Sequence, residues 1–403
     1  MAGIPLPVNA MRPAESAESS APEFSPIENE TPLRWHRRLH LVPADGLGAG
    51  RRAVFYALVT WLPIAIWAAL QGRLLADDSG ERLLQHYGVH VRCLVAIPLF
   101  ILAEAALHKA TLRFVPQFVA GGLIAPAERV RFDQQLAGIR RLRNTSLPWI
   151  FVLGVALAWS IGTPVEPHSD HMAWAVDPDG GMGFGGWWFA FVARPVFLAL
   201  LLGWLWRLAL VTLWMARVGR LNLSLVPTHP DHVGGLGFLE KLPGAFSMVT
   251  FALSAVLASR WAHDVVHHGT TLGSLKLPMI GFVVLWSLLL LAPLLALMPA
   301  LAACRRNALV AYSNLVGEQG RLVHRRWILG EPVEATPLLD APEIGPVADA
   351  NAMYDAVKSM RGFPFSKHSL MAILLPLALP LLALAALQVP LKELLLKLAK
   401  TLI

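Results

Sequence analysis

Seven stretches of this sequence stay apolar over the length that a membrane crossing requires. A helix rises about 1.5 Å per residue, so a hydrocarbon core about 30 Å thick needs roughly 20 mostly apolar residues. Arg92 and Glu104 interrupt the second stretch, and the fourth is long enough to tilt or to extend beyond the bilayer. The pattern predicts an all-α, polytopic transmembrane helical bundle. The stretches cover residues 53–70, 92–108, 147–162, 187–215, 244–261, 277–303 and 369–388.

The composition excludes an ordinary soluble domain. Apolar residues make up 55% of the 403 positions and charged residues 15%, whereas a soluble domain carries about a quarter charged residues. Many of the 14 tryptophans lie near the ends of apolar stretches, where an indole suits the headgroup layer. The net charge of +7 therefore indicates contact with the lipid bilayer, and with anionic lipids of its inner leaflet, rather than binding of nucleic acid.

Lysine and arginine are unevenly distributed between the predicted spans. If the N-terminus is cytoplasmic, 24 of the 34 basic residues fall in inner segments and 8 in outer segments. Cytoplasmic loops carry the excess of Lys and Arg in membrane proteins, so this bias predicts a cytoplasmic N-terminus and a C-terminus on the outer side. Cys93 and Cys304 then lie near opposite faces of the membrane, and no disulfide is expected between them.

The chain divides into three regions. Residues 1–33 are acidic and rich in Pro and Ser, which predicts a disordered tail. Residues 34–388 form the membrane domain, with a cytoplasmic insert at 304–368. In that insert, residues 305–327 have an apolar stripe among five arginines, which predicts an amphipathic helix on or near the inner leaflet. Residues 389–403 repeat the amphipathic pattern and predict a C-terminal interfacial helix.

The stretch PTHPDHVGGLGF (227–238) is the most elaborate connection between two spans. One interpretation is a plain turn, because Thr and Asp cap turns and Gly permits positive φ. A phosphate cradle of backbone N–H groups is a second, although no GxxxxGK[ST] surrounds it. The apolar residues among the glycines favour a third, a structured loop at the inner mouth of the bundle that serves as a gate or ligand lip. The residues of this candidate site are Thr228, His229, Asp231, His232, Gly234, Gly235 and Gly237.

Two charged residues lie deep within predicted spans. Ionised groups at membrane depth cost several kcal/mol unless they are paired or hydrated. At about 1.5 Å per residue, Glu104 lies roughly 18 Å along the second span and Arg207 roughly 24 Å along the fourth. We therefore expect the two to pair in the inner half of the membrane. The alternative is that Arg207 extends to the interface and that Glu104 lies at a helix end.

Histidines collect in the connections predicted to face outward. His263 and His267 are spaced i, i+4, as in the HExxH helices that bind zinc. With His171 as a third ligand, they predict a metal site for Zn²⁺. Asp264 stands where those helices have Glu, and its shorter side chain reaches a metal-bound water less well. The alternative is that these histidines are polar cover at the membrane interface.

Five blocks carry a resemblance to a known family: TWLPIAIW (60–67), HVRCLVAIPLFILAE (90–104), WLWRLAL (204–210), RLNLSLVPTHPDHVGGLGFL (220–239) and VPLKELLLKL (389–398). The chain resembles a family of uncharacterised bacterial multi-pass integral membrane proteins, and HPD-x-x-GGLGFL is the most specific block. The resemblance implies a shared fold in the bacterial inner membrane, which would place the C-terminus in the periplasm. It implies no catalytic residues.

Three function classes remain open. A channel or transporter would place Glu104, Arg207 and the 227–238 loop along a polar path, and their coincidence on the inner side favours this class. A scaffold or assembly protein would hold partners with its tail and amphipathic helices. An enzyme would use the outward His and Asp residues with a bound metal, and it is the least favoured class. A continuous polar path would indicate transport, and a sealed interior would indicate a scaffold.

Overall fold

The computed structural model describes residues 24–43, 46–75, 82–163, 172–177, 179–267, 269–333 and 345–387, and within them every regular element longer than a single β-bridge is a helix. Seven of these helical segments are long and apolar enough to cross a membrane. The predicted all-α bundle is confirmed, and the chain is compatible with a multi-pass integral membrane protein. The segments are α2 (Ala49–Leu70), α3 to α4 (Tyr87–Ala120), η3 to α6 (Pro126–Gly162), α7 to α8 (Phe184–Val218), η6 to α9 (Gly237–His267), α10 (Leu272–Leu295) and α13 (Lys367–Ala385).

Several of these segments are composite. The pieces of the membrane segments are α3 (Tyr87–His90), η2 (Val91–Ala96), α4 (Ile97–Ala120), η3 (Pro126–Glu128), α5 (Arg129–Asn144), α6 (Leu147–Gly162), α7 (Phe184–Trp188), η5 (Phe189–Ala193), α8 (Arg194–Val218), η6 (Gly237–Phe246) and α9 (Ser247–His267). The remaining helices are α1 (Thr31–Arg38), η1 (Leu83–Gln85), η4 (Ala173–Ala175), α11 (Met298–Val323), η7 (His324–Ile328) and α12 (Gly345–Ser359).

Two spans contain a wide helical turn just before a proline. The π-helical η2 precedes Pro98 and the π-helical η5 precedes Pro195. A proline inside a helix offers no N–H to the carbonyl four residues earlier, and its ring crowds that carbonyl. A π-helical turn carries one extra residue, which makes room at this point. Both spans therefore continue past the proline without a break.

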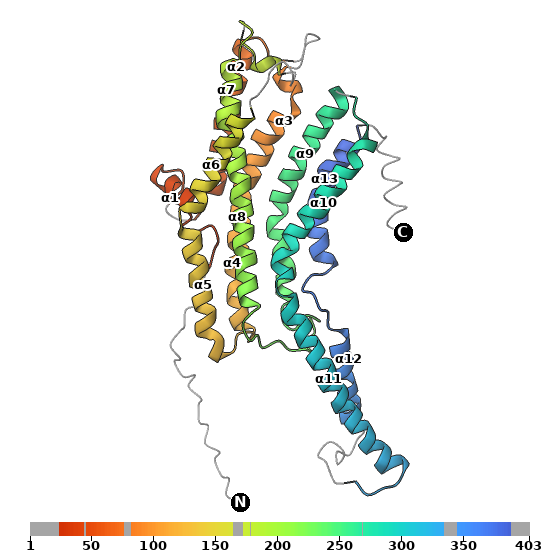
Figure 1. Ribbon diagram of the computed structural model, residues 1–403. Helices are drawn as coiled ribbons and strands as arrows, with labels where there is room; N and C mark the ends of the chain where they lie inside the picture. The colour runs from red at the N-terminus through yellow and green to blue at the C-terminus, as the bar shows by residue number, and fades with distance from the viewer. Residues whose placement is uncertain are drawn as a thin grey trace, which may run out of the picture.

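The largest apolar core lies along α8, which packs against α4, α5 and α10. Trp204 and Trp214 from α8 and Phe100 and Phe118 from α4 are among the largest fully buried side chains. The indole of Trp204 donates to the carbonyl of Phe100 at 3.0 Å, so a polar group in the core is satisfied. Figure 1 shows α9, α10 and α13 as a second group of helices beside α4 and α8. The groups meet where α4 packs against α9 and α8 against α10, and the same apolar core continues into the second group.

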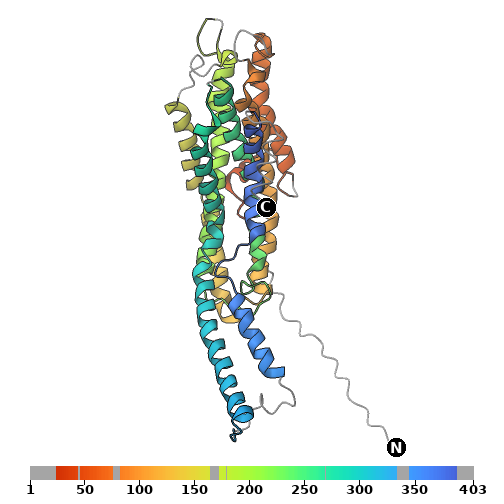
Figure 2. The same ribbon diagram turned by 90° about the vertical axis from the view of Figure 1, so that its right-hand side faces the viewer.

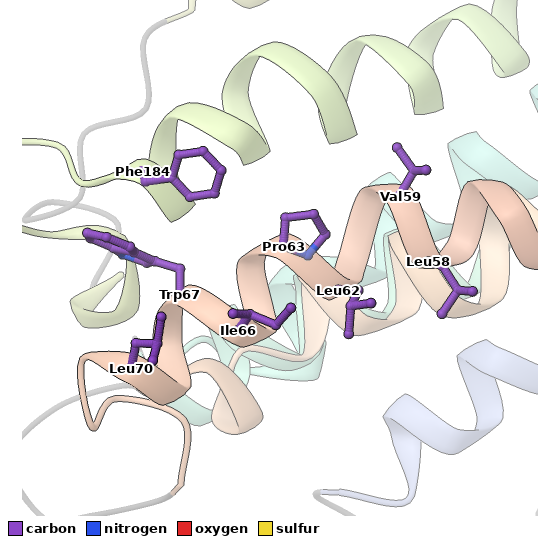
Figure 3. Close-up of a pocket in the computed structure, with 8 residues that line it drawn as sticks. All are labelled: Leu58, Val59, Leu62, Pro63, Ile66, Trp67, Leu70 and Phe184. Atoms are coloured by element: carbon purple, nitrogen blue, oxygen red, sulfur yellow. The ribbon is translucent and has the colours of Figure 1, made fainter.

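The outer faces of the spans expose apolar side chains, as a lipid environment requires. On α2 the exposed residues Leu58, Leu62, Ile66 and Leu70 recur every four positions and form one stripe. The same stripe lines a groove of about 440 Å³ between α2 and Phe184 of α7, and all of its lining residues are apolar (Figure 3). An apolar groove on a lipid-facing stripe needs no other occupant than acyl chains.

The insert between α10 and α13 differs from its prediction. The stretch 277–303 does not form one span, because α10 ends at Leu295 and α11 begins at Met298. Nor does the arginine-rich stretch turn across the end of the bundle to lie along a membrane surface. Instead α11 leads away from the bundle, and α12 packs against it to form a helical hairpin (Figures 1 and 2). The predicted C-terminal helix at 389–403 lies outside the described residues.

Candidate functional site

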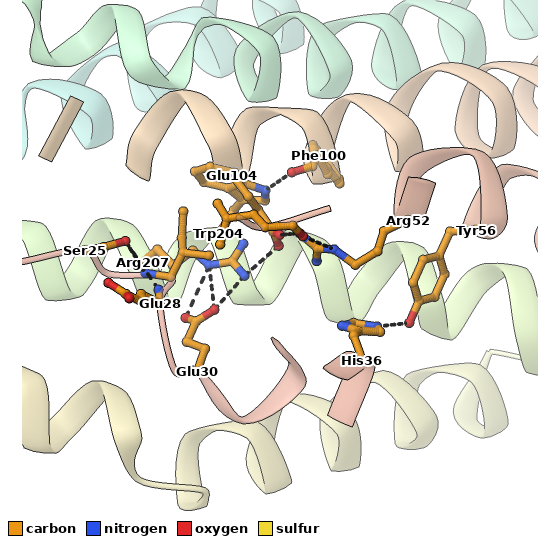
Figure 4. Close-up of polar contacts among 12 residues, drawn as sticks. Ser25, Glu28, Glu30, His36, Arg52, Tyr56, Phe100, Glu104, Trp204 and Arg207 are labelled. Carbon is orange, nitrogen blue, oxygen red and sulfur yellow. Dashed lines mark hydrogen bonds and ion pairs between the residues drawn. The ribbon is translucent and has the colours of Figure 1, made fainter. Parts of the chain in front are cut away.

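Four charged side chains meet in the interior of the bundle (Figure 4). We call Glu30, Arg52, Glu104 and Arg207 the ion network. The Glu104 carboxylate accepts from Nη2 of Arg52 at 2.6 Å through one oxygen and from Nη2 of Arg207 at 2.8 Å through the other. Arg207 also donates from Nε and Nη2 to the Glu30 carboxylate, at 3.1 and 2.7 Å. The sequence paired Glu104 with Arg207, and the structure brings these two together, but within a larger set.

The ion network is buried and electrically balanced. Its side chains are 1–4% exposed, and its two arginines match its two glutamates. A buried ion is tolerated when it is paired and its remaining polar atoms have partners, and Arg52 meets this condition by donating from Nε to the carbonyl of Leu47 at 3.0 Å. Arg207 lies over the rings of Trp149 and Trp204, with centroids 5.8 and 5.1 Å from its Cζ. The geometry holds four charges together, and each of them is buried against a partner of opposite sign.

The N-terminal segment, residues 24–33, is where the sequence prediction was wrong. It was assigned to a disordered tail over 1–33, yet Phe24 and Ile27 are among the buried core residues. Ser25 fixes the segment in two ways: its hydroxyl hydrogen-bonds to Nδ1 of His108 at 2.8 Å, and its carbonyl accepts from Nη1 of Arg143. Residues 1–23 lie outside the described residues. The composition of the segment resembles a tail, but Ser25 and Glu30 bind polar partners inside the bundle.

A second polar pair extends from the ion network towards α1. Nε2 of His36 and the hydroxyl of Tyr56 are 2.6 Å apart. Burial, followed by the positive charge of Arg52, lowers the pKa of His36 to about 4. The imidazole is therefore neutral near pH 7, and it adds no further charge to the neighbourhood of Arg52. Glu30, Arg52 and His36 were not grouped with the predicted pair, because all three precede the first predicted span.

The loop 227–238 is built around one carboxylate. Asp231 accepts backbone N–H groups from Val233 at 2.9 Å, Gly235 at 3.2 Å and Gly237 at 2.8 Å. Nδ1 of His229 lies 2.9 Å from the same carboxylate. Burial raises the pKa of Asp231, but the three N–H groups and His229 lower it more, so that it lies below its usual value. These N–H groups are the ones that a phosphate cradle would need, and the protein's own aspartate already occupies them.

The glycines of the loop have distinct tasks. Gly234 and Gly235 have φ of +67° and +96°, which side chains rarely adopt, and the neighbouring His232 has φ of 59°. At Gly237 an added Cβ would lie 2.9 Å from Cβ of Asp231, so that only glycine allows the carboxylate to close over the loop. Thr228 lies half-buried at the start. Of the apolar residues in and just after the loop, Val233, Leu236 and Leu239 are fully buried, so this segment packs into the bundle. A role as a gate or ligand lip stays a prediction.

The loop also binds the end of the hairpin. The carbonyl of His232 accepts the N–H of Arg361 at 2.7 Å, and Nδ1 of His232 lies 2.9 Å from the hydroxyl of Ser359, the last residue of α12. The guanidinium of Arg361 donates to Glu240 at 2.6 Å and to the carbonyl of Asp231 at 3.2 Å. We call residues 226–240 the anchor loop, because they join the end of α12 to the bundle.

The histidines predicted to bind metal are only partly brought together. The rings of His263 and His267 are 4.7 Å apart between centroids, and His86 lies 5.3 Å from His263. Burial, followed by the charge of His263, lowers the pKa of His86 to about 3. His171, the predicted third ligand, lies outside the described residues. Among the residues that are described, no group of three or more His, Cys, Asp or Glu has the arrangement of a metal site.

Comparison with known proteins identifies no relative. No protein-family model, no curated protein sequence and no solved structure matches the chain. The arrangement of the ion network, the anchor loop and the hairpin is therefore the ground for a functional proposal.

Proposed function

We propose that this chain is a non-catalytic scaffold of the bacterial inner membrane, in which a closed helical bundle holds the α11–α12 hairpin out towards a protein partner. The observation that carries the proposal is the anchor loop. The most elaborate connection in the chain closes on its own aspartate and then fixes Ser359 and Arg361 at the end of the hairpin. A loop with this task positions an external element and needs no ligand of its own.

The hairpin has the surface of a binding element. Val310 and Ile328 are 62% and 70% exposed, and Met353 on α12 is exposed as well. Contiguous apolar patches that lie outside the spans mark interaction sites, and arginine is enriched at such sites; we take these exposed residues as part of one. The partner that fits is a protein with an apolar surface bordered by acidic residues. The arginines of the hairpin are Arg305, Arg306, Arg321, Arg325 and Arg326.

Transport, which the sequence favoured, has less support from the geometry. A transporter would need Glu104 and Arg207 along a polar path through the bundle. In the structure each is buried and bound to a group of opposite charge. The anchor loop, which was the expected gate, has its backbone donors engaged by Asp231. Transport therefore stands as the alternative that an experiment has to separate from the scaffold.

Membrane and orientation complete the proposal. The resemblance to bacterial multi-pass proteins supports the inner membrane, and the excess of Lys and Arg supports a cytoplasmic N-terminus, anchor loop and hairpin. In this orientation the arginines at the base of α11 also lie near the anionic headgroups of the inner leaflet.

Site-specific photocrosslinking in cells tests the scaffold. A photoreactive phenylalanine analogue at Val310 or at Ile328 should give a discrete protein adduct. The same analogue at Leu58, which is 50% exposed on the lipid-facing stripe of α2, should give none. Each adduct should also be lost when Arg361→Ala releases the hairpin from the anchor loop.

Ion flux into proteoliposomes tests the transport alternative. The closed bundle should leave the flux of protons, potassium and chloride at the level of protein-free vesicles. Flux that depends on Glu104, together with hairpin positions that give no protein adduct, would reject the scaffold in favour of transport.

A further inference from the structure

The cavity that holds the N-terminal segment is basic. Arg52 of α2, Arg143 of α5 and Arg207 of α8 each reach its interior, and their side chains are buried or nearly so. Glu104 is the one acidic member of the ion network that a span supplies. Without the segment, the ion network would hold two arginines against a single glutamate, a net positive charge at a depth where an unpaired charge is costly. The arginines therefore favour an anion at this site, against the burial that raises the pKa of Glu30 to about 7.

The segment supplies that anion as an inserted ligand would. Its backbone before α1 is not helical, and such backbone is tolerated at membrane depth only where protein or a cavity surrounds it. Side chains provide most of its contacts: Glu30 binds Arg207 through the forked arrangement of Nε and Nη2, and Phe24 and Ile27 fill apolar space. A carboxylate on an apolar body is the chemistry that the cavity accepts.

Arg207 retains capacity beyond what Glu30 uses. Its Nη1 is buried and has no hydrogen-bond partner among the described residues. A buried N–H donor without an acceptor is unfavourable, and native proteins seldom contain one without a functional reason. The guanidinium fork that binds one carboxylate can therefore make a further hydrogen bond to an anion that sits differently from Glu30.

We propose that residues 24–33 are an internal ligand of an anion site, and that a single-chain amphiphile with a carboxylate headgroup binds there when the segment withdraws. Its carboxylate takes the place of Glu30 on Arg207, with Nη1 as an additional donor. Its alkyl chain takes the place of Phe24 and Ile27. The site lies in the bundle and is independent of the hairpin, so it stands or fails separately from the scaffold.

A reversible disulfide that holds residues 24–33 in place, called the lock below, tests the proposal in the full-length protein. The hydroxyl oxygens of Thr31 and Ser146 are 3.4 Å apart, so cysteines at these two positions would direct their sulfur atoms towards each other. The variant T31C/S146C, with Cys93 and Cys304 replaced by alanine, holds the segment in place when oxidised and frees it when reduced. A gel shift on reduction verifies the lock.

The probe is dibrominated stearate in nanodiscs of phosphatidylcholine, read by quenching of tryptophan fluorescence. Trp149 and Trp204 lie beside Arg207, so an acid bound in the cavity quenches them. If the segment occupies the site about nine-tenths of the time, its removal strengthens apparent binding about tenfold. We therefore expect the reduced lock to bind the acid more tightly than the oxidised lock, and Glu30→Gln to bind about tenfold more tightly than wild type.

Two controls identify the chemistry. The methyl ester of the same probe has no charge and should quench oxidised and reduced proteins equally. Arg207→Lys keeps the charge but loses the fork, and it should reduce the gain that follows release of the segment. Equal quenching by the acid in locked, released and Glu30→Gln proteins would overturn the proposal. So would a gain that the methyl ester reproduces, because the cavity would then be an apolar site only.

Discussion

The order of the buried charges, Arg52–Glu104–Arg207–Glu30, predicts which substitutions compensate one another. Glu104→Gln removes the carboxylate shared by both arginines. Arg207 keeps Glu30, whereas Arg52 keeps only the carbonyl of Leu47 and becomes an unpaired buried cation. Removing one partner of a buried pair costs about 3–5 kcal/mol, so we expect a loss of that size in the free energy of unfolding.

The second substitution decides between arrangements. Arg52→Gln added to Glu104→Gln removes the stranded cation and leaves Arg207 and Glu30 as an intact, neutral pair. We expect this double variant to recover about 2–3 kcal/mol relative to the sum of the single variants, within the range measured for coupled neighbours. Arg207→Gln added to Glu104→Gln is also neutral in sum, but it leaves Arg52 and Glu30 each without its ionic partner. That double variant should therefore be at least as unstable as Glu104→Gln alone.

Unfolding in mixed micelles with increasing SDS, followed by circular dichroism, gives these free energies for purified variants. Arg325 and Glu331 provide a matched control, because their atoms are also 2.8 Å apart but their side chains are 54% and 46% exposed. An exposed pair contributes about 0–1 kcal/mol, so Arg325→Gln should have little effect. If Glu104→Gln is compensated better by Arg207→Gln than by Arg52→Gln, the order of charges is wrong.

Four further outcomes are expected. Gly237→Ala should lower the melting temperature through overpacking worth about 1–3 kcal/mol, because its Cβ meets Asp231, whereas Gly244→Ala in the same helix meets nothing within 4 Å and should not. Burial raises the pKa of Asp231, but the accepted N–H groups bring it below its usual value. The carboxylate therefore stabilises the fold fully above about pH 4 and loses this effect at lower pH. The stabilities of wild type and Asp231→Asn should then converge in acid. Burial lowers the pKa of His36 to about 4, so stability falls as the pH drops from about 6.5 towards that value, and His36→Gln should lack this slope. A reporter active only in the periplasm should give signal when fused after Ile403, and signal from a cytoplasmic reporter there would contradict the proposed orientation.

The spans could be predicted because their signal is local. Each apolar stretch has the length of a membrane crossing by itself, and even the second, which Arg92 and Glu104 interrupt, forms a helix from Tyr87 to Ala120. What failed was the geometry between elements. The break between Leu295 and Met298 and the outward course of α11 depend on how α12 packs, and hydropathy does not report that packing.

The candidate sites divide along the same line. The anchor loop was recognisable from its residues, since Asp231 and the glycines act within six positions of one another. The contact between the anchor loop and the hairpin could not be predicted, because Arg361 lies 121 residues away in the sequence from its partner Glu240. Glu30 was missed for a similar reason. Its partner Arg207 lies 177 residues away, and nothing near Glu30 in the sequence indicates a buried position.

Counting the buried charges of the spans would have shown that a carboxylate was missing, which the structure identifies as Glu30. The first predicted span began at residue 53 and left Arg52 outside, so that Glu104 and Arg207 looked like a complete pair. The structure begins α2 at Ala49 and buries Arg52. Two arginines against one glutamate is an arrangement that the membrane interior does not tolerate, so a further anion has to come from a segment that is not a span. Glu28, Glu30 and Asp45 are the acidic residues that most closely precede Arg52 in the sequence, and among the described residues Glu30 is the one that the bundle encloses. The burial of Arg52 at the start of α2, rather than its position at a span end alone, is therefore what requires the polar segment before it to fold inward, although the composition of that segment resembles a tail.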